Sequence, residues 1–316
     1  MKDVPAVSVV IPLFNKGPYI GRALRSVFKQ TFQDLEVIVV DDGSSDDGGN
    51  VVTNFNDPRI TLIRQVNRGV SAAMNKGIAA ARAELIAFLD ADDEWFPDHL
   101  ETLIRLRNKF PRSGAYATAV LLKTEGSEYK MAPFAEIPKA PWEGILPNYF
   151  RAAAMGNPPV SSTTVAIPRA VLTDMKGFSE EAWWGEDTDL WGRIALRYSI
   201  AFSWEGGGIY HIDAANRACN KIKPVPMNAF VVHAQKVLQA GEVPEGLHDD
   251  LLEYIAVKQI ETADRNTEAG RPDLAREILR NVDTKHLGRR RRLSMLKTYI
   301  PHRILIATRN WNQAKE

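Results

Sequence analysis

Residues 7–47 read "VSVVIPLFNKGPYIGRALRSVFKQTFQDLEVIVVDDGSSDD", and this stretch decides the fold. It contains two short apolar runs, at 7–11 and 35–40, each of which ends at polar turn residues. Between the runs, apolar side chains recur at the three- and four-residue spacing of a helix with one buried face: Ile20, Ala23, Leu24, Val27 and Phe28. The stretch therefore predicts a strand, a helix and a second strand parallel to the first.

The same alternation continues to residue 90. Two more strand-like runs lie at 60–63 and 84–89, and both are apolar without polar alternation. The helical spacing returns before the last of them, at Val70, Ala73, Met74, Gly77, Ile78 and Ala81. Strands that are apolar on both faces are typical of a parallel sheet covered by helices on both sides. We therefore predict an α/β sheet with the order β-α-β-α-β-α-β.

Polar loops follow three of these four strands. They read "PLFNKG" at 12–17, "DDGSSDD" at 41–47 and "DADDEW" at 90–95. Asp, Gly and Ser also form turns and helix caps, so each loop alone has a structural explanation. In open α/β sheets, however, ligands bind at the carboxyl ends of the strands, where these three loops would meet. Their convergence favours a binding site.

The remaining chain divides into a mixed part and a helical part. Residues 116–122 and 162–167 have strand-like composition, and helices are expected at 168–175 and 185–199. Beyond about residue 220 the pattern is mostly helical, with two helices joined at Gly270-Arg271-Pro272, where glycine ends one and proline begins the next. We predict one domain over 1–218 and a helical C-terminal extension over 219–316.

Composition narrows the class of protein. The 316 residues are 45% hydrophobic and 25% charged, which is typical of a folded chain with a large core. The net charge of +1 gives no reason to expect nucleic-acid binding. A single cysteine excludes an internal disulfide and cysteine-rich zinc sites. The N-terminus lacks a signal-peptide pattern and no apolar run approaches the roughly 18 to 20 residues of a membrane span, so we expect a cytoplasmic protein.

Three blocks in order carry a family resemblance. They are residues 7–47, residues 67–93 ("NRGVSAAMNKGIAAARAELIAFLDADD") and residues 184–194 ("WGEDTDLWGRI"). Together they resemble the inverting, nucleotide-sugar-dependent glycosyltransferases of family 2, and the likeness extends over about residues 5 to 215. The order and spacing of the blocks are more specific than any single motif among them.

The resemblance implies a fold and an activity. The expected fold is the GT-A fold, with a mainly parallel mixed sheet followed by the helical extension. The expected activity is transfer of a hexosyl or N-acetylhexosaminyl group from a nucleoside-diphosphate sugar, most simply a UDP-sugar, to a hydroxyl of a saccharide or lipid-linked acceptor. Such a reaction would belong to bacterial surface polysaccharide or glycolipid synthesis. A catalytically silent nucleotide-sugar-binding or scaffolding protein is the alternative.

The sequence "DAD" at 90–92 has a direct role in that chemistry. The leaving diphosphate gains negative charge, which a divalent cation can stabilise as a Lewis acid. Mg²⁺ and Mn²⁺ prefer carboxylate oxygens, often only one or two from the protein. The resemblance implies that Asp92 contacts the metal, that Asp90 holds the ribose or the metal, and that Ala91 belongs to the same donor-binding segment. For Asp93 and Glu94 the alternative is the start of the next helix, which we prefer for Glu94.

Five further residues are expected at the donor nucleotide. The resemblance assigns Pro12 and Phe14 to the wall of the base pocket and Asp41 to a hydrogen bond with the base. Arg68 and Asn75 fall in the block that flanks the base and the phosphates, where an arginine beside a diphosphate is physically reasonable. The alternative for Arg68 is a solvated loop charge.

An inverting transfer also needs a general base for the acceptor hydroxyl. On the expected helix, Asp187 shares a face with Trp191 and Ile194, whereas Asp189 should point away and Glu186 is at the margin. Desolvation on that face would raise the pKa of Asp187. The resemblance independently assigns the base to Asp187, although a capping role is the alternative and both roles can coexist.

Two features beyond the base have open interpretations. His211 follows an expected strand and is either a third metal ligand, as in some GT-A enzymes, or a structural histidine. Trp183 and Trp184 are either an acceptor platform or core residues.

The C-terminal end is strongly basic. Residues 280–316 carry ten Lys and Arg against two acids, which leaves the rest of the chain at about −7. Arg289 to Arg292 precede apolar residues that would share one side of a helix, namely Leu293, Leu296, Ile300, Ile304 and Trp311. Basic amphipathic helices bind anionic membrane surfaces, so peripheral membrane contact is one explanation. A solvated tail or a helix packed on the protein is the other.

Overall fold

The structure is a computed structural model that describes residues 4–124, 126–214, 216–217 and 220–305. The strands are β1 (Val7–Leu13), β2 (Leu35–Asp41), β3 (Ile60–Arg64), β4 (Leu85–Phe88), β5 (Glu94–Trp95), β6 (Ala115–Lys123), β7 (Lys130–Met131), β8 (Glu143–Ile145), β9 (Val165–Pro168) and β10 (Ile200–His211). The helices are α1 (Gly17–Phe28), α2 (Gly48–Asn54), α3 (Val70–Ala80), α4 (His99–Lys109), α5 (Tyr149–Met155), α6 (Arg169–Asp174), α7 (Glu186–Arg197), α8 (Ala229–Ala240), α9 (His248–Glu268), α10 (Pro272–Arg280) and α11 (Gly288–Lys297).

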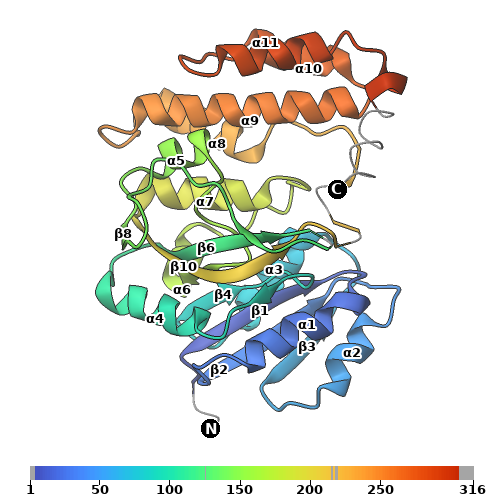
Figure 1. Cartoon of the computed structure of the whole chain (residues 1–316), viewed down its shortest axis with the longest axis vertical. Helices are drawn as coiled ribbons and strands as arrows, with labels where there is room; N and C mark the ends of the chain where they lie inside the picture. The colour runs from blue at the N-terminus through green and yellow to red at the C-terminus, as the bar shows by residue number, and fades with distance from the viewer. Residues whose placement is uncertain (1–3, 125, 215, 218–219, 306–316) are drawn as a thin grey trace.

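One mixed sheet forms the centre of the molecule (Figure 1). Its strand order is β3-β2-β1-β4-β9-β6-β10-β5, with β7 and β8 paired at the side. Strands β3, β2, β1 and β4 are parallel, whereas β9 runs antiparallel to both of its neighbours. The mainly parallel mixed sheet expected from the sequence is therefore confirmed.

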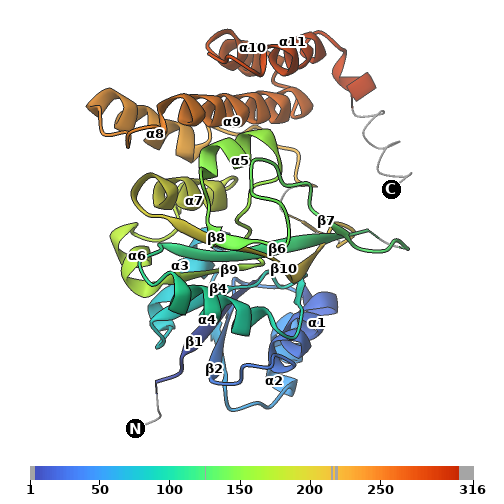
Figure 2. The same cartoon turned by 60° about the vertical axis from the view of Figure 1, so that its left-hand side comes forward.

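The first strands are buried on both faces, as their apolar runs predicted. In β1, Val9 packs in the core under α1, while Val10 points to the other face, toward Met74 of α3. Helix α3 approaches the sheet very closely, because a Cβ on Gly77 would overlap the side chain of Val10. Figures 1 and 2 show α1 and α4 on one side of the sheet and α7 on the other.

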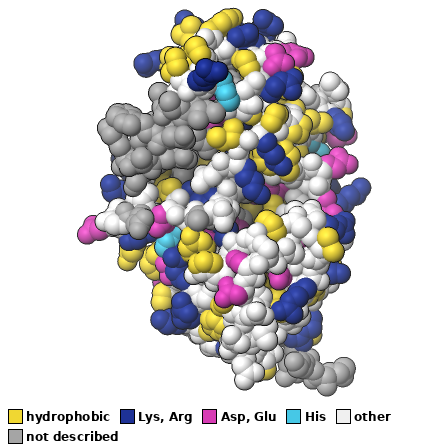
Figure 3. Space-filling model, turned by 90° about the vertical axis from the view of Figure 1, so that its right-hand side faces the viewer, with side chains coloured by type: hydrophobic (Ala, Val, Ile, Leu, Met, Phe, Trp, Pro, Cys, Tyr) yellow, Lys and Arg dark blue, Asp and Glu magenta, His cyan; other side chains and the backbone are white. Residues whose placement is uncertain are grey.

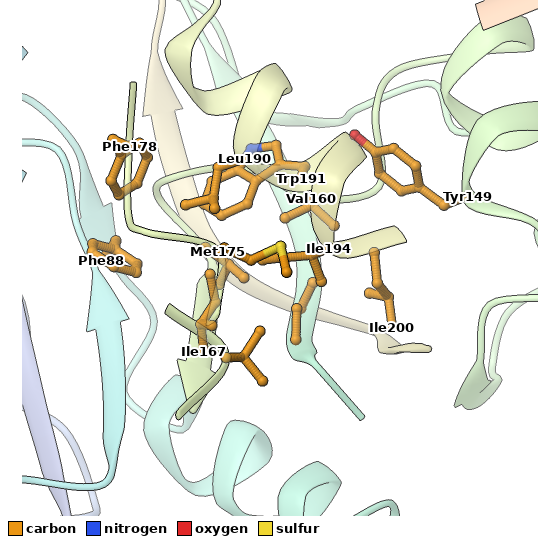
Figure 4. Close-up of a cluster of buried hydrophobic side chains, with 14 of the residues drawn as sticks. Phe88, Tyr149, Val160, Ile167, Met175, Phe178, Leu190, Trp191, Ile194 and Ile200 are labelled. Atoms are coloured by element: carbon orange, nitrogen blue, oxygen red, sulfur yellow. The ribbon is translucent and has the colours of Figure 1, made fainter. Parts of the chain in front are cut away.

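A second cluster fills the space between the sheet and α7 (Figure 4). Trp191 and Ile194 of α7 are fully buried there with Met175 and Phe178, and Phe178 meets Trp191 edge to face with ring centroids 5.9 Å apart. The apolar stripe predicted for this helix is thus confirmed.

The helical extension shares this core. Phe230 of α8 stacks on Phe150 of α5 with ring centroids 5.8 Å apart, and Tyr254 of α9 packs against both rings. The far half of α9 joins α10 and α11 in a separate apolar cluster. Helices α10 and α11 thus form the outermost layer, which α9 separates from the rest (Figures 1 and 2). The division at residue 218 stays a prediction.

The acids after β4 do not start a helix. Glu94 lies in β5, which pairs with β10 at Ile209, and α4 begins only at His99. Our preferred interpretation of Glu94 as a helix start is therefore wrong. The reason is local: strand pairing holds the backbone of 94–95 extended, and Pro97 follows before the helix can form.

None of the described helices combines the length and the apolar character that a membrane span requires.

Candidate active site

Strand register brings the three predicted loops to one edge of the sheet. Pro12 pairs with Val40 and Leu13 with Asp41, so the chain leaves β1 and β2 side by side. On the other side of β1, Val10 pairs with Phe88, two residues before Asp90. The loops that carry Phe14, Asp41 and Asp90 therefore lie next to one another in space, as expected from a parallel sheet.

A polar hollow of about 250 Å³ opens beside Asp41, lined also by Ser44, Asp46, Arg64 and Gln65. The Asp41 carboxylate is mostly buried; its Oδ1 accepts the Ser44 backbone N–H at 2.9 Å, and Arg64 lies 3.9 Å from Oδ2. The hollow is open and lined by hydrogen-bonding groups, which suits a polar heterocycle. Phe14 is 39% exposed.

A cation from the first loop meets the acids of the third loop. Lys16 Nζ lies 2.5 Å from Asp92 Oδ2, and both side chains are largely buried. Arg22 of α1 donates to the backbone carbonyl of Asp92. Our reading of the sequence did not include Lys16. The signal was present, because "FNKG" places a lysine at the sheet edge where the acidic loop must also lie.

The carboxyl group of Asp90 has a raised pKa. Burial raises the pKa of Asp90 to about 7, and the negative charge of Asp92 adds to the rise. The Ser162 hydroxyl donates to Asp90 Oδ2 at 2.9 Å and opposes that shift, while the charge of Asp187 contributes to it. Asp187 therefore lies within electrostatic range of Asp90, although the two residues are far apart in sequence.

These carboxylates suit a divalent cation. Asp90 and Asp92 offer hard oxygen donors, and the positive charge of Lys16 offsets only part of the rise in the pKa of Asp90 that burial and the charge of Asp92 cause. Among the described residues no group of three or more His, Cys, Asp or Glu side chains could hold a metal by itself. A site with one or two carboxylates, completed by phosphates and waters, is the arrangement in which proteins usually hold Mg²⁺.

The side chain of Asp93 anchors the acidic loop that follows β4. It is 1% exposed, its carboxylate accepts the Thr163 hydroxyl, and it accepts the backbone N–H of His211 at 2.9 Å. Burial raises the pKa of Asp93 well above its ordinary value, and the charges of Asp90 and Asp92 act in the same direction. The contacts tie the acidic loop to β10.

Both ring nitrogens of His211 face carboxylates. Nε2 lies 2.9 Å from Glu94 Oε1, and Nδ1 lies 3.5 Å from Asp213 Oδ1. The hydrogen bond from His211 holds the pKa of Glu94 below its ordinary value. Metal ligation by His211 stays a prediction.

Asp42 has a structural task that the sequence did not reveal. It is 3% exposed, and its two oxygens accept the backbone N–H groups of Arg68 and Gly69, each at 2.8 Å. The carboxylate thus fixes the loop that begins α3. The two adjacent aspartates therefore have different surroundings. Asp41 lines the hollow, whereas Asp42 binds the loop that begins α3.

Arg68 and Asn75 both contact the segment in front of α7. Arg68 Nη2 lies 3.0 Å from Glu180 Oε2, in an exposed ion pair. The Asn75 amide donates to the Phe178 carbonyl at 2.9 Å and accepts the Phe178 N–H at 2.9 Å. In the absence of a ligand these two side chains connect α3 to the segment that leads to Asp187. Their contacts with a nucleotide stay predictions.

Asp187 lies in the first turn of α7. Gly185 precedes the helix with a left-handed φ of 76°, and the backbone N–H of Thr188 donates to Asp187 Oδ1 at 2.6 Å. Burial raises the pKa of Asp187, and the Thr188 hydrogen bond and the charge of Lys258 oppose that rise. Burial and the charge of Asp187 raise the pKa of Glu186 to about 8. The first turn of α7 thus holds two carboxyl groups whose pKa values are raised.

Asp189 is buried, although its position lies on the side of α7 away from Trp191 and Ile194. It is 3% exposed and forms an ion pair at 2.8 Å with Arg193, one turn further along α7. Arg193 also donates to the carbonyl of Gly177 at 2.9 Å. Position on the helix alone could not predict this, because the pair is buried by the loop before α7 and by α8 rather than by the apolar stripe.

The sequence comparisons establish the family. Residues 8–171, just over half of the chain, match the sequence model of Glycosyl transferase family 2. The chain belongs to this family. It is 42% identical over 103 residues to an uncharacterized glycosyltransferase of Nostoc sp., a match that covers 32% of each chain. It is 41% identical over 105 residues to the putative glycosyltransferase EpsH of Bacillus subtilis, covering 33% of this chain and 30% of the relative.

These matched regions span about a third of the length of the two relatives. A longer match joins the chain to an uncharacterized glycosyltransferase of Rickettsia prowazekii, with 27% identity over 225 residues and 69% of both chains covered.

Two solved structures have the same fold. The crystal structure of Staphylococcus aureus TarS 1-349 in complex with UDP-GlcNAc aligns with a TM-score of 0.59 and 18% identity, covering 93% of this chain and 89% of TarS. The mannosyltransferase PcManGT of Pyrobaculum calidifontis, in complex with GDP-Man and Mn²⁺, aligns with a TM-score of 0.59 and 19% identity, covering 96% and 84%. These likenesses confirm the GT-A fold expected from the sequence.

Proposed function

We propose that this protein is an inverting, metal-dependent glycosyltransferase that uses a UDP-sugar donor and a hydroxyl acceptor. The observation that carries the proposal is the convergence of Asp41, Asp90 with Asp92, and Asp187 near the carboxyl ends of the parallel strands β1, β2 and β4. Membership of Glycosyl transferase family 2 supports the same reaction, as do the solved structures of this fold in complex with UDP-GlcNAc or GDP-Man.

The donor binds at the edge formed by β1, β2 and β4. Asp41 accepts an N–H from the base in the polar hollow, and Pro12 and Phe14 form the apolar wall beside it. Asp42 keeps the Arg68 loop in place through its backbone hydrogen bonds. Arg68 and Asn75 lie at the phosphate side, and Ala91 lies in the segment that contacts the ribose.

Asp92 and Asp90 would hold Mg²⁺ or Mn²⁺, which supplies positive charge for the leaving diphosphate. Lys16 keeps the Asp92 carboxylate in one orientation through their ion pair. Ser162 does the same for Asp90 through its hydrogen bond. The assignment of His211 as a further ligand is part of the proposal, although Glu94 and Asp213 must then release its ring nitrogens.

Asp187 takes the proton from the acceptor hydroxyl as that oxygen attacks the anomeric carbon. Its raised pKa makes it a better proton acceptor than an exposed aspartate, and the N-terminus of α7 favours its charged form once the acceptor is bound. Attack from the side opposite the leaving diphosphate inverts the anomeric configuration. The proton transferred to Asp187 leaves to solvent after the product departs.

The acceptor is a saccharide or a lipid-linked saccharide in bacterial surface polysaccharide or glycolipid synthesis. Bacterial relatives support this placement. We place the protein in the cytoplasm at the inner face of the membrane, where nucleotide sugars and lipid carriers meet.

A donor screen with an aspartate variant tests the function. Thermal shift with UDP-, GDP- and dTDP-sugars in the presence of Mn²⁺ should identify one donor class that raises Tm, because a ligand that binds the folded state stabilises it. The Asp187→Asn variant should keep that shift and lose about 100-fold or more of its transfer rate. Asp174→Asn, an exposed aspartate on α6, is the matched control and should keep full activity.

Two outcomes would count against the proposal. If no sugar nucleotide shifts Tm in a folded sample, the donor assignment is wrong. If donors bind but Asp187→Asn and the wild type are equally inactive with every acceptor tested, the silent binding protein becomes the better description.

A further inference from the structure

Helix α11 is attached to the extension by one side only. Ser294 and Thr298 are 2% and 3% exposed where they face α9 and α10. On the flanks, Arg290 lies 3.6 Å from Glu261 and Lys297 lies 3.8 Å from Asp264, both on α9. Arg276 of α10 donates to the Thr298 carbonyl at 2.7 Å. These contacts hold one side of α11 against α9 and α10.

The opposite side of α11 is apolar and faces outward. Leu293, Leu296 and Ile300 are 51%, 64% and 40% exposed. At about 100° per residue these three side chains lie within roughly 60° of one another around the axis. Ile300 continues the helical direction, because its N–H donates to the Lys297 carbonyl at 3.1 Å. An apolar stripe of this spacing normally faces a core, and here it faces away from one.

Basic side chains border the stripe. Helix α11 contains four arginines and one lysine and no acidic residue. Arg289 and Arg292 are exposed on the outward side, next to Leu293 and Leu296. Beyond the helix, Tyr299 and Ile304 are 65% and 53% exposed, and the Tyr299 ring packs against Arg276 of α10. Figure 3 shows hydrophobic and basic side chains next to each other at the upper end of the molecule, where Figure 1 places α10 and α11.

We propose that the outer α11 face, defined by Arg289, Arg292, Leu293, Leu296 and Ile300, binds the surface of an anionic lipid bilayer. Apolar side chains between cations match acyl chains below negatively charged headgroups. A second copy of the chain is a poor occupant, because two such faces would bring arginines against arginines. The inference rests on the proposed placement at a membrane but not on the transfer reaction.

Vesicle co-sedimentation of the full chain tests this face. The wild type should bind vesicles of equal parts phosphatidylglycerol and phosphatidylcholine, and not vesicles of phosphatidylcholine alone. Each basic residue near an anionic surface contributes about 1 kcal/mol, so Arg289→Ser with Arg292→Ser should reduce the partition coefficient at least tenfold. Leu293→Ser with Leu296→Ser should reduce it by a similar factor, since apolar burial is lost.

A matched control removes exposed apolar side chains elsewhere. Ile145→Ser with Met155→Ser replaces residues that are 48% and 55% exposed on β8 and α5, and it should leave lipid binding unchanged. Unchanged Tm in all variants shows that they fold. Donor thermal shifts, measured in parallel, separate a failure of the lipid surface from a failure of the proposed catalytic function.

Three results would overturn the inference. The wild type could fail to sediment with anionic vesicles, or the α11 variants could sediment as well as the wild type. A concentration-dependent dimer that the Leu293 and Leu296 substitutions abolish, without lipid binding, would assign the face to a second copy of the chain.

Discussion

Lys16 Nζ is 2.5 Å from Asp92 Oδ2, so the loop after the first strand supplies a positive charge to the acidic loop after the fourth. These two residues lie 76 positions apart in sequence, and only the parallel pairing of β1 with β4 brings them together. The ion pair partly offsets the repulsion that a cluster of acids at a strand end creates.

Replacing Lys16 should weaken donor binding. In Lys16→Met the apolar stem is kept, but Asp92 loses its charged partner and Asp90 loses a positive charge that lowers its pKa. Asp90 then holds a proton more readily, and the acidic loop binds the metal and the donor diphosphate less well. We expect a donor Kd about tenfold higher, or about 1.4 kcal/mol. Titration calorimetry with Mn²⁺ measures it. Lys29→Met, an exposed lysine after α1, should bind like the wild type, and equal affinities for all three proteins would contradict the role.

The transfer rate should fall at low pH, and the midpoint of this fall should lie above the pKa of an ordinary aspartate. Burial raises the pKa of Asp187 above that of an ordinary aspartate. The ionised base is therefore lost as pH falls through that raised pKa, and the rate is fully developed above it. We expect kcat/KM, which reports the pKa of the free protein, to have an acid limb whose midpoint exceeds that of an ordinary aspartate. The residual rate of Asp187→Asn should lack this limb. A wild-type kcat/KM that stays constant down to a pH of about 4 would contradict a buried aspartate base.

Gly192 should be intolerant of a methyl group. It lies on α7, and a Cβ there would overlap the ring of Phe230 on α8. Gly192→Ala should lower the free energy of unfolding by about 1–3 kcal/mol, as overpacked cores do. Urea denaturation measures the change. Gly288→Ala, on α11, has nothing within 4 Å of the new Cβ and should be neutral or slightly stabilising. Equal stability of Gly192→Ala and the wild type would mean that α7 and α8 do not pack this tightly.

The local patterns predicted the first half of the fold well. Val9 and Val10, adjacent in β1, are both fully buried, which is what an apolar run without alternation indicates. The stripe of α7 was equally readable, since Trp191 and Ile194 follow helical spacing. The strands β7 and β8 could not be predicted, because these short segments are held by pairing with β6 and β10 rather than by their own pattern.

The site was predictable where a residue acts through its own chemistry, and not where it acts through a distant partner. Asp41 and Asp92 were expected from their motifs, and their ligand contacts stay predictions. Lys16 was missed because its partner lies on another loop. The burial of Asp189 was not predicted, because the loop that holds its partner Arg193 is a tertiary feature. Glu94 was misassigned since its strand exists only through pairing with β10.

The stacking of Phe230 on Phe150 makes the extension inseparable from the catalytic part of the chain. A protein cut at residue 218 would leave Phe150 without the rings of Phe230 and Tyr254, and it should aggregate rather than fold. Domain exchange between relatives therefore has to carry α5, α7 and α8 together.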